Sequence, residues 1–232
     1  MRNILTIVFV FGFIASFSQD IDTVLKKHYE AMGSEKLSKI KTISLNMSMT
    51  VMGQTTFMKM RLKNPDKIYA EMQVMGEEVL MVVNGENAIM KMGDQVMPMD
   101  EKQKQELVGQ LNLEGDLYNY KEKGHQISLR GEGVADGKKY YLIDALLKDK
   151  ENTPMVMFIN TETYLIDKME VTVNENGQEM TMTLTIDEYF VQDGITIVSK
   201  ISSVYEGMNI MDITLSDVVY GAELDDNLFI IE

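Results

Sequence analysis

The strongest pattern in the chain is an alternation of apolar and polar residues between positions 57 and 92. Segments 58–63, 68–74 and 88–92 each place apolar side chains on one face and polar side chains on the other, and 79–83 is apolar throughout. Asn64-Pro65-Asp66 and Asn84-Gly85 separate these segments with residues typical of tight turns. The pattern predicts an antiparallel meander with one apolar face.

Similar segments on both sides of this meander predict further strands. One precedes it at 43–51. Asp136-Gly137, Asn176-Gly177 and Asp193-Gly194 are turn sequences between later segments. These later strands are expected at 95–99, 125–131, 138–147, 155–160, 164–173, 180–186, 195–201, 211–215 and around Phe229.

Two segments carry apolar residues at helical spacing instead. In 20–32 the apolar positions form one stripe and the first turn is acidic, with Gly33 as the end and Ser34 as N-cap of a further turn to Ile40. The second helix, 100–111, begins with a capping box of Asp100 and Gln103, and we expect 115–124 to be a polar connection after it. We expect both helices to cover the apolar face as a lid, with the lid residues Leu25, Tyr29, Met32, Leu107 and Leu111.

Together these elements predict a mainly β domain with helices, a half-open antiparallel β-barrel of about 11–12 strands with an amphipathic helical lid. A sheet of this size that is apolar on one side must curl around that side or be covered. A slip of one residue would bury charged side chains, so the register is well determined. In it, Lys59, Arg61, Glu71, Thr181 and Thr183 point to solvent.

The first eighteen residues have the features of a signal peptide. Arg2 precedes a short apolar run, and Ser16-Phe17-Ser18 offers small residues where signal peptidase cleaves. We therefore expect cleavage before Gln19 and a single domain from 19 to 232, soluble in an exported compartment. The sequence contains no cysteine, and its net charge of −14 argues against nucleic acid as a partner.

Methionine is unusually frequent. There are 21, and six pairs have the spacing Met-x-Met, which places both thioethers on one face of a strand. Three interpretations remain open: core packing, an adaptable lining for flexible apolar ligands, and thioether ligation of copper(I). The candidate cavity residues are Met47, Met49, Met58, Met60, Met72, Met81, Met90, Met92, Met180 and Met182.

Catalysis and a metal centre of the zinc type are not indicated. The two histidines, His28 and His125, are far apart and no cysteine accompanies them. Gly131-Glu132-Gly133 lacks the strand-to-helix context of a phosphate loop and is expected to be a turn or bulge. The carboxylates are scattered, so we expect no enzyme and no cofactor.

Several stretches resemble the periplasmic outer-membrane lipoprotein carrier (Lol-type) superfamily, in its outer membrane lipoprotein-sorting protein-like branch. They are FMKMRLKNPDKIYAE (57–71), VNGENA (83–88), DGKKYYL (136–142), FINTETYLIDK (158–168) and YFVQDGI (189–195). The resemblance implies an unclosed antiparallel barrel with a helical lid, which carries lipoprotein acyl chains across the periplasm between membrane-protein partners. Carriers tend to have Arg before the Pro, where it helps hold the lid; Asn64 stands there in this chain.

The leading hypothesis is a non-enzymatic periplasmic carrier or sensor that binds lipoprotein acyl chains or another lipidic ligand in a methionine-rich apolar cavity. Two other hypotheses assume the same fold. One is a methionine-rich copper(I)-binding protein, and the other is a structural or signalling domain that binds a protein.

Overall fold

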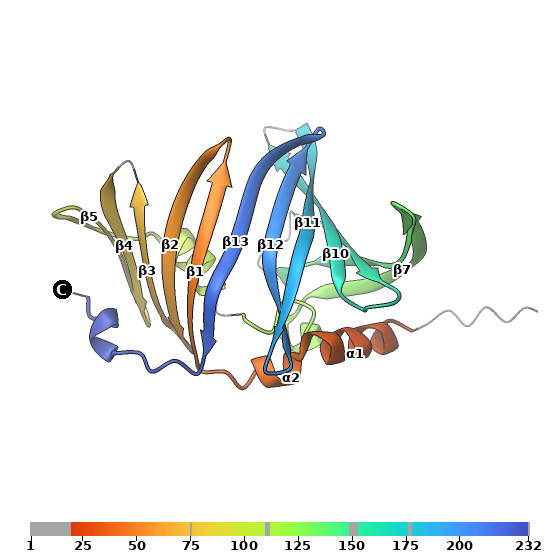
Figure 1. Cartoon of the computed structure of the whole chain (residues 1–232), viewed down its shortest axis with the longest axis horizontal. Coiled ribbons are helices and arrows are strands. Elements are labelled where there is room, and N and C mark those ends of the chain that lie inside the picture. The colour runs from red at the N-terminus through yellow and green to blue at the C-terminus, as the bar shows by residue number, and fades with distance from the viewer. Residues whose placement is uncertain (1–19, 75, 110–111, 149–152, 176–177, 232) are drawn as a thin grey trace, which may run out of the picture.

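Thirteen antiparallel strands form one sheet in the computed structural model, which describes residues 20–231 apart from 75, 110–111, 149–152 and 176–177 (Figure 1). The predicted signal peptide and the Asn176-Gly177 turn lie outside the described residues. The strands are β1 Thr42–Val51, β2 Gln54–Lys63, β3 Lys67–Val74, β4 Glu77–Asn84, β5 Asn87–Met92, β6 Gln95–Pro98, β7 Gln126–Ala135, β8 Lys138–Leu146, β9 Met155–Asn160, β10 Ile166–Glu175, β11 Gln178–Gln192, β12 Ile195–Tyr205 and β13 Met208–Tyr220.

Two meanders, β1–β6 and β7–β13, make up this sheet. Each strand pairs with its neighbours in sequence, and the pairing of β1 with β13 joins the two meanders. The order is β6-β5-β4-β3-β2-β1-β13-β12-β11-β10-β9-β8-β7, with β6 and β7 at the two edges. The sheet is therefore open, as the half-open barrel prediction requires, with thirteen strands where 11–12 were expected.

The cross-strand register keeps apolar residues on one face from strand to strand. Ile43, Leu62, Ile68, Val83 and Ala88 pair in one row across β1–β5, and all five are buried. Paired residues share a face, so the predicted alternation extends across the whole sheet. We call this apolar face the inner face and the opposite one the outer face.

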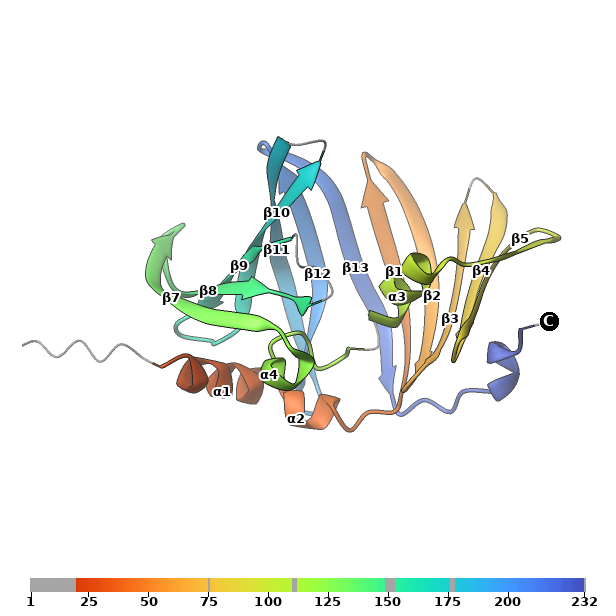
Figure 2. The same cartoon turned by 180° about the vertical axis from the view of Figure 1, so that it is seen from behind.

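Four helices accompany the sheet: α1 Ile21–Met32, α2 Ser34–Leu37, α3 Glu101–Val108 and α4 Tyr120–Lys123. Gly33 ends α1 in the left-handed conformation, with φ of 71°, as expected for a C-cap glycine. The predicted capping box of α3 is present, with the Asp100 side chain accepting from the Gln103 backbone N–H at 2.8 Å. Helix α1 runs along the lower ends of the strands (Figure 1), and α3 lies over the inner face of β1 and β2, in front of them in Figure 2.

Three sequence predictions need correction. Ser34 is the first residue of α2 and Gly33 is its N-cap, and the buried Ser34 Oγ makes no hydrogen bond to any described residue. The expected strand at Phe229 is a 3-10 helix, η3 Asp226–Phe229, because this segment packs against the sheet through one buried ring. The polar connection at 115–124 contains α4 and also Leu117, which is only 3% exposed.

Two separate hydrophobic clusters form the core. The first lies under α2 and α3 and combines Leu37 and Leu107 with buried residues of β1–β5 and β12–β13. The second lies at α1, where Val24 and Leu25 pack with residues of β8 and β9 and with Leu117. Each predicted lid helix thus covers its own part of the inner face.

Candidate ligand-binding face

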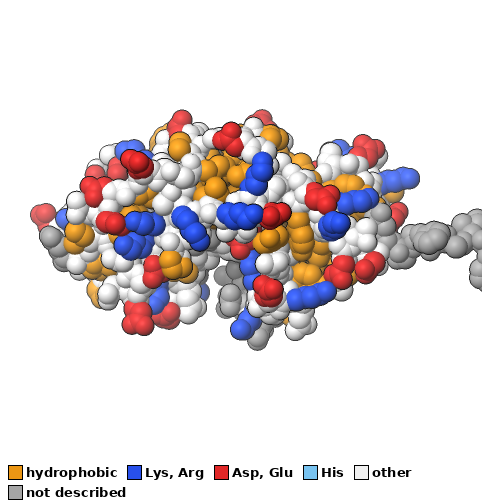
Figure 3. Space-filling view, turned by 90° about the horizontal axis from the view of Figure 1, so that it is seen from below, with side chains coloured by type: hydrophobic (Ala, Val, Ile, Leu, Met, Phe, Trp, Pro, Cys, Tyr) orange, Lys and Arg blue, Asp and Glu red, His pale blue; other side chains and the backbone are white. Residues whose placement is uncertain are grey.

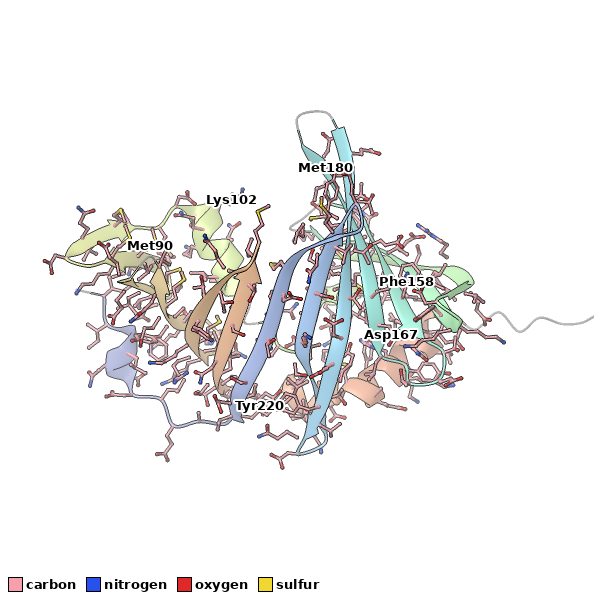
Figure 4. The ribbon with its side chains drawn as sticks, turned by 45° about the horizontal axis from the view of Figure 1, so that its top comes forward. Met90, Lys102, Phe158, Asp167, Met180 and Tyr220 are labelled. Carbon is pink, nitrogen blue, oxygen red and sulfur yellow. The ribbon has the colours of Figure 1, made fainter. Side chains whose placement is uncertain are left out.

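The ten candidate methionines all lie on inner-face positions of the register. Met47, Met58 and Met72 pair directly across β1–β3, and Met81 pairs with Met90 across β4–β5. Met180 and Met182 lie on β11, in the other meander, opposite Val173 and Val171. Met90 and Met180 lie in opposite halves of the sheet (Figure 4). The structure therefore groups most of the set along β1–β5 and leaves two members apart.

The candidates differ in depth. Met60 and Met81 are 3% and 8% exposed and belong to the first core cluster, whereas Met92 is 39% exposed. A side chain as buried as Met60 has no surface left for a ligand. The half-buried members are Met47, Met49, Met58, Met72, Met90, Met180 and Met182.

An apolar strip lies between the two core clusters. Of its residues, only Met49 and Met182 were predicted from the sequence as cavity residues. Met49, Ile213, Ile201 and Ile186 pair in one row across β1, β13, β12 and β11. Each of these four is half-buried, and neither core cluster includes any of them. We define the central strip as Met49, Met182, Leu184, Ile186, Ile201, Met211 and Ile213. The row could not be found from the sequence because the β1–β13 pairing is not local.

The predicted lid residues pack at the two ends of this strip. Leu107 of α3 is 8% exposed in the first cluster, and Leu25 of α1 is 1% exposed in the second. Tyr29 and Met32 are half-buried, and the Tyr29 hydroxyl donates to the Leu117 carbonyl at 2.5 Å. Burial, with the nearby Tyr120 and Asp22, raises the pKa of Tyr29 to about 12, so this donor stays protonated. Leu111 lies outside the described residues.

The two histidines have structural surroundings. His28 on α1 is 6% exposed, and its Nδ1–H donates to the Tyr164 carbonyl at 2.7 Å. Burial lowers the pKa of His28, which keeps the ring neutral. His125 accepts a hydrogen bond from the Lys148 backbone at its Nδ1. Within the described ranges, no group of three or more His, Cys, Asp or Glu side chains could hold a metal ion.

Three solved structures share this architecture. A LolA superfamily protein from Nitrosomonas europaea matches with a TM-score of 0.60 and 15% identity, over 92% of this chain and 99% of that chain. A DUF1329 family protein from Desulfovibrio piger matches with a TM-score of 0.59 and 15% identity, over 89% of this chain and 96% of that chain. A putative outer membrane lipoprotein-sorting protein domain from Vibrio parahaemolyticus matches with a TM-score of 0.56 and 14% identity, over 89% of this chain and 97% of that chain. The fold is that of the Lol-type carriers. No family model and no curated protein matches the sequence.

Asn64, at the position where the Lol-type resemblance places a lid-holding residue, joins the β2–β3 turn to the segment that follows α2. Its side-chain amide donates to the Ile40 carbonyl at 3.2 Å, and its backbone N–H donates to the Lys41 carbonyl at 2.8 Å. The residue thereby holds the segment that connects α2 to the sheet. Both hydrogen bonds of Asn64 therefore connect the β2–β3 turn to the chain just after α2.

The outer face of this Lol-type sheet carries the predicted polar residues. Lys59 and Glu71 form an ion pair at 3.0 Å, and Arg61 is half-buried because its guanidinium donates to the Leu45 and Met60 carbonyls. Thr181 is exposed and Thr183 is half-buried. At the lower ends of the strands, which Figure 3 views from below, basic, acidic and hydrophobic side chains are intermingled. No helix in the described part of the chain is long and apolar enough to span a bilayer.

Sequence reasoning missed two cavities on the outer face. The first, about 650 Å³, lies over β13, β1, β2 and β3. The second, about 590 Å³, lies between the outer face of β3–β6 and the C-terminal segment around η3. The sequence signals were the apolar Phe57 beside the first cavity and the apolar Leu80, Val82, Ile89 and Val96 beside the second, since these positions are normally polar on a solvent face.

Proposed function

We propose that this protein is a non-enzymatic, exported carrier or sensor, located in the periplasm, that binds the acyl chains of lipoproteins or another lipidic ligand along the central strip. The observation that supports it best is the row of half-buried apolar side chains between two separately packed clusters. A filled core would bury such a row, whereas a binding site leaves it accessible. The Lol-type fold agrees with this proposal.

The energetics suit an acyl chain. A sixteen-carbon chain gains on the order of 10 kcal/mol when it leaves water, at about 0.8 kcal/mol per methylene. The methionines of the strip and its borders are unbranched and adapt to chains of different shape. Release of so apolar a ligand requires either a movement of the lid helices or an acceptor that binds the ligand more tightly. The lid helices α1 and α3 are the elements that we expect to move.

The test is a titration with a fluorescent fatty acid and with an acylated peptide, accompanied by measurement of the unfolding temperature. We expect saturable binding and a rise in unfolding temperature. Met49→Asp and Met182→Asp introduce a charge into the strip and are expected to weaken binding at least about tenfold, because a carboxylate beside an alkyl chain loses its hydration.

Met92→Asp is the matched control, because this candidate methionine lies on β5, on the same face but outside the central strip, and is 39% exposed; its substitution should leave binding unchanged. Met60→Asp should instead destabilise the fold, since it places a carboxylate in the first core cluster. The proposal fails if neither ligand binds, or if both strip variants bind as tightly as the wild type.

Copper(I) binding is a second candidate, favoured by the direct pairing of Met47, Met58 and Met72 on adjacent strands. Side chains paired in this way have Cβ atoms about 5 Å apart, within reach of a common soft metal ion. Met58→Leu discriminates the two functions because it keeps the volume and removes the sulfur. A copper(I) protein would lose metal affinity in this variant, as measured against a competing chelator, whereas acyl-chain binding would be retained.

A further inference from the structure

The outer cavity over β13, β1, β2 and β3 has a composition unlike that of the inner face. Its lining takes three consecutive residues from each of three strands, 46–48, 57–59 and 71–73. The middle residue of each triplet is an inner-face methionine, so the backbone of that residue forms the floor. The side chains that point outward on either side of it form the walls.

The cavity arises where two strands part. The pairing of β2 with β3 runs from Lys63 and Lys67 up to Met58 and Met72, and among the described residues it does not continue beyond that point. Above it the β2 and β3 ends diverge (Figure 1). The space of about 650 Å³ falls within the range of about 300–1,000 Å³ that is usual for small-ligand pockets.

The walls present mainly hydroxyl and amide groups, from Asn46, Ser48, Thr55, Gln73, Thr214 and Ser216. The carboxylate of Asp217, beside the lining, accepts hydrogen bonds from the Asn46 amide at 2.8 Å and the Ser216 hydroxyl at 3.3 Å. The one cation and the one anion of the lining, Lys59 and Glu71, neutralise each other at 3.0 Å. With a chain charge of −14, the cavity offers an anionic ligand no uncompensated positive charge.

Phe57 is the single aromatic side chain of the lining, and it is 71% exposed although it lies in the middle of a sheet. An exposed ring on a polar face gains free energy when a ligand covers it. The face of the ring carries partial negative charge and attracts weakly positive C–H groups. The matching ligand therefore has an apolar C–H face and a rim of uncharged polar groups.

We propose that this cavity binds a neutral oligosaccharide, with one sugar ring stacked on Phe57 and its hydroxyl groups hydrogen-bonded to the amide and hydroxyl side chains of the walls. This site is separate from the acyl-chain site on the inner face. It extends the proposed function, because the protein would recognise a glycan on one side of the sheet and a lipid on the other.

The probes are maltotriose, cellotriose and triacetylchitotriose, titrated into the full chain and followed by calorimetry and by amide chemical shifts. At least one is expected to bind with a Kd of about 1 mM or below. Phe57→Leu keeps the apolar volume without the ring and should weaken binding at least about tenfold. Phe57→Tyr keeps the ring and should bind within about threefold of the wild type.

Val134→Ala is the control, because Val134 is 72% exposed on β7, away from the cavity, and should leave oligosaccharide binding unchanged. Fatty-acid binding should be the same in Phe57→Leu and in the wild type, so this result stands independently of the acyl-chain site. The proposal is overturned if none of the three probes binds, or if Phe57→Leu binds as tightly as the wild type. Binding of an uncharged peptide with the same response to Phe57→Leu, without oligosaccharide binding, would also overturn it.

Discussion

Single residues show that the direction of a side chain and its depth have different origins. Met60 and Met92 both point to the inner face, as the alternation predicts, yet they are 3% and 39% exposed. Direction follows from the two-residue period of a strand. Depth depends on what lies above the strand, and the core cluster that contains Leu107 of α3 surrounds Met60.

His28 should make folding stability depend on pH. Burial lowers its pKa in the folded state, so below the unfolded pKa of about 6.5 the unfolded chain binds a proton that the folded chain does not. The contribution of the neutral ring is therefore complete above about pH 6.5, and it is lost as the pH falls towards the lower folded pKa, by at most about 1.4 kcal/mol per pH unit.

Urea unfolding of wild type and His28→Gln from pH 7.5 down to 5 measures this effect. The free energy of unfolding of the wild type should fall more steeply than that of the variant over this interval. Parallel curves would show that His28 titrates alike in the folded and unfolded chains.

At the scale of elements, local signals predicted the helices well. The capping box at Asp100 and the glycine at the end of α1 both lie where the sequence indicates. The docking of these helices was less evident. Thr196 on β12 donates to the Ala31 carbonyl at 2.6 Å and Lys36 donates to the Asp193 carbonyl at 3.0 Å, which joins the α1–α2 corner to the β11–β12 turn.

Gly33 is the critical residue of this corner. A Cβ there would lie 2.5 Å from the Gly194 carbonyl oxygen, in addition to the strain of a φ of 71°. Gly53 has a similar φ of 82°, but a Cβ there would meet nothing within 4 Å. Gly53→Ala should therefore cost about 1 kcal/mol of stability, and Gly33→Ala at least about 2 kcal/mol more.

Thermal or urea unfolding of the two variants gives the comparison. Because both alanines are strained alike, the difference isolates the close approach of α1 to the β11–β12 turn. Equal losses of stability would mean that this contact does not persist in solution.

At the scale of the whole molecule, the C-terminal segment folds back onto the first meander. After β13 pairs with β1, the chain crosses to the outer face of β3 and β4, where Phe229 is completely buried. The Asn84 side chain donates to the Phe229 carbonyl at 2.9 Å, and Asp226 forms ion pairs with Lys63 and Lys67. This C-terminal segment covers part of the outer face of the first meander.

Phe229→Ala should destabilise the protein by about 3–5 kcal/mol, because it leaves a cavity beneath η3. The adjacent Ile230 is 53% exposed, so Ile230→Ala should cost less than about 1 kcal/mol. Urea unfolding measures both values. A small loss for Phe229→Ala, similar to that for Ile230→Ala, would contradict the anchoring role of the segment.

The sequence by itself determined the strands, their faces and the two cover helices, because the periods of two and 3.6 residues and the cap and turn residues act over a few positions. It also placed the ten methionines on one face. The tertiary structure decided which of them are buried and which remain accessible. The tertiary structure also created the central strip and the outer cavity. Both form only because β1 pairs with β13, whose residues are more than 150 positions away in the chain. It turned the expected strand at Phe229 into a 3-10 helix and buried Leu117, since those conformations follow from the surface that each segment meets and not from its own pattern.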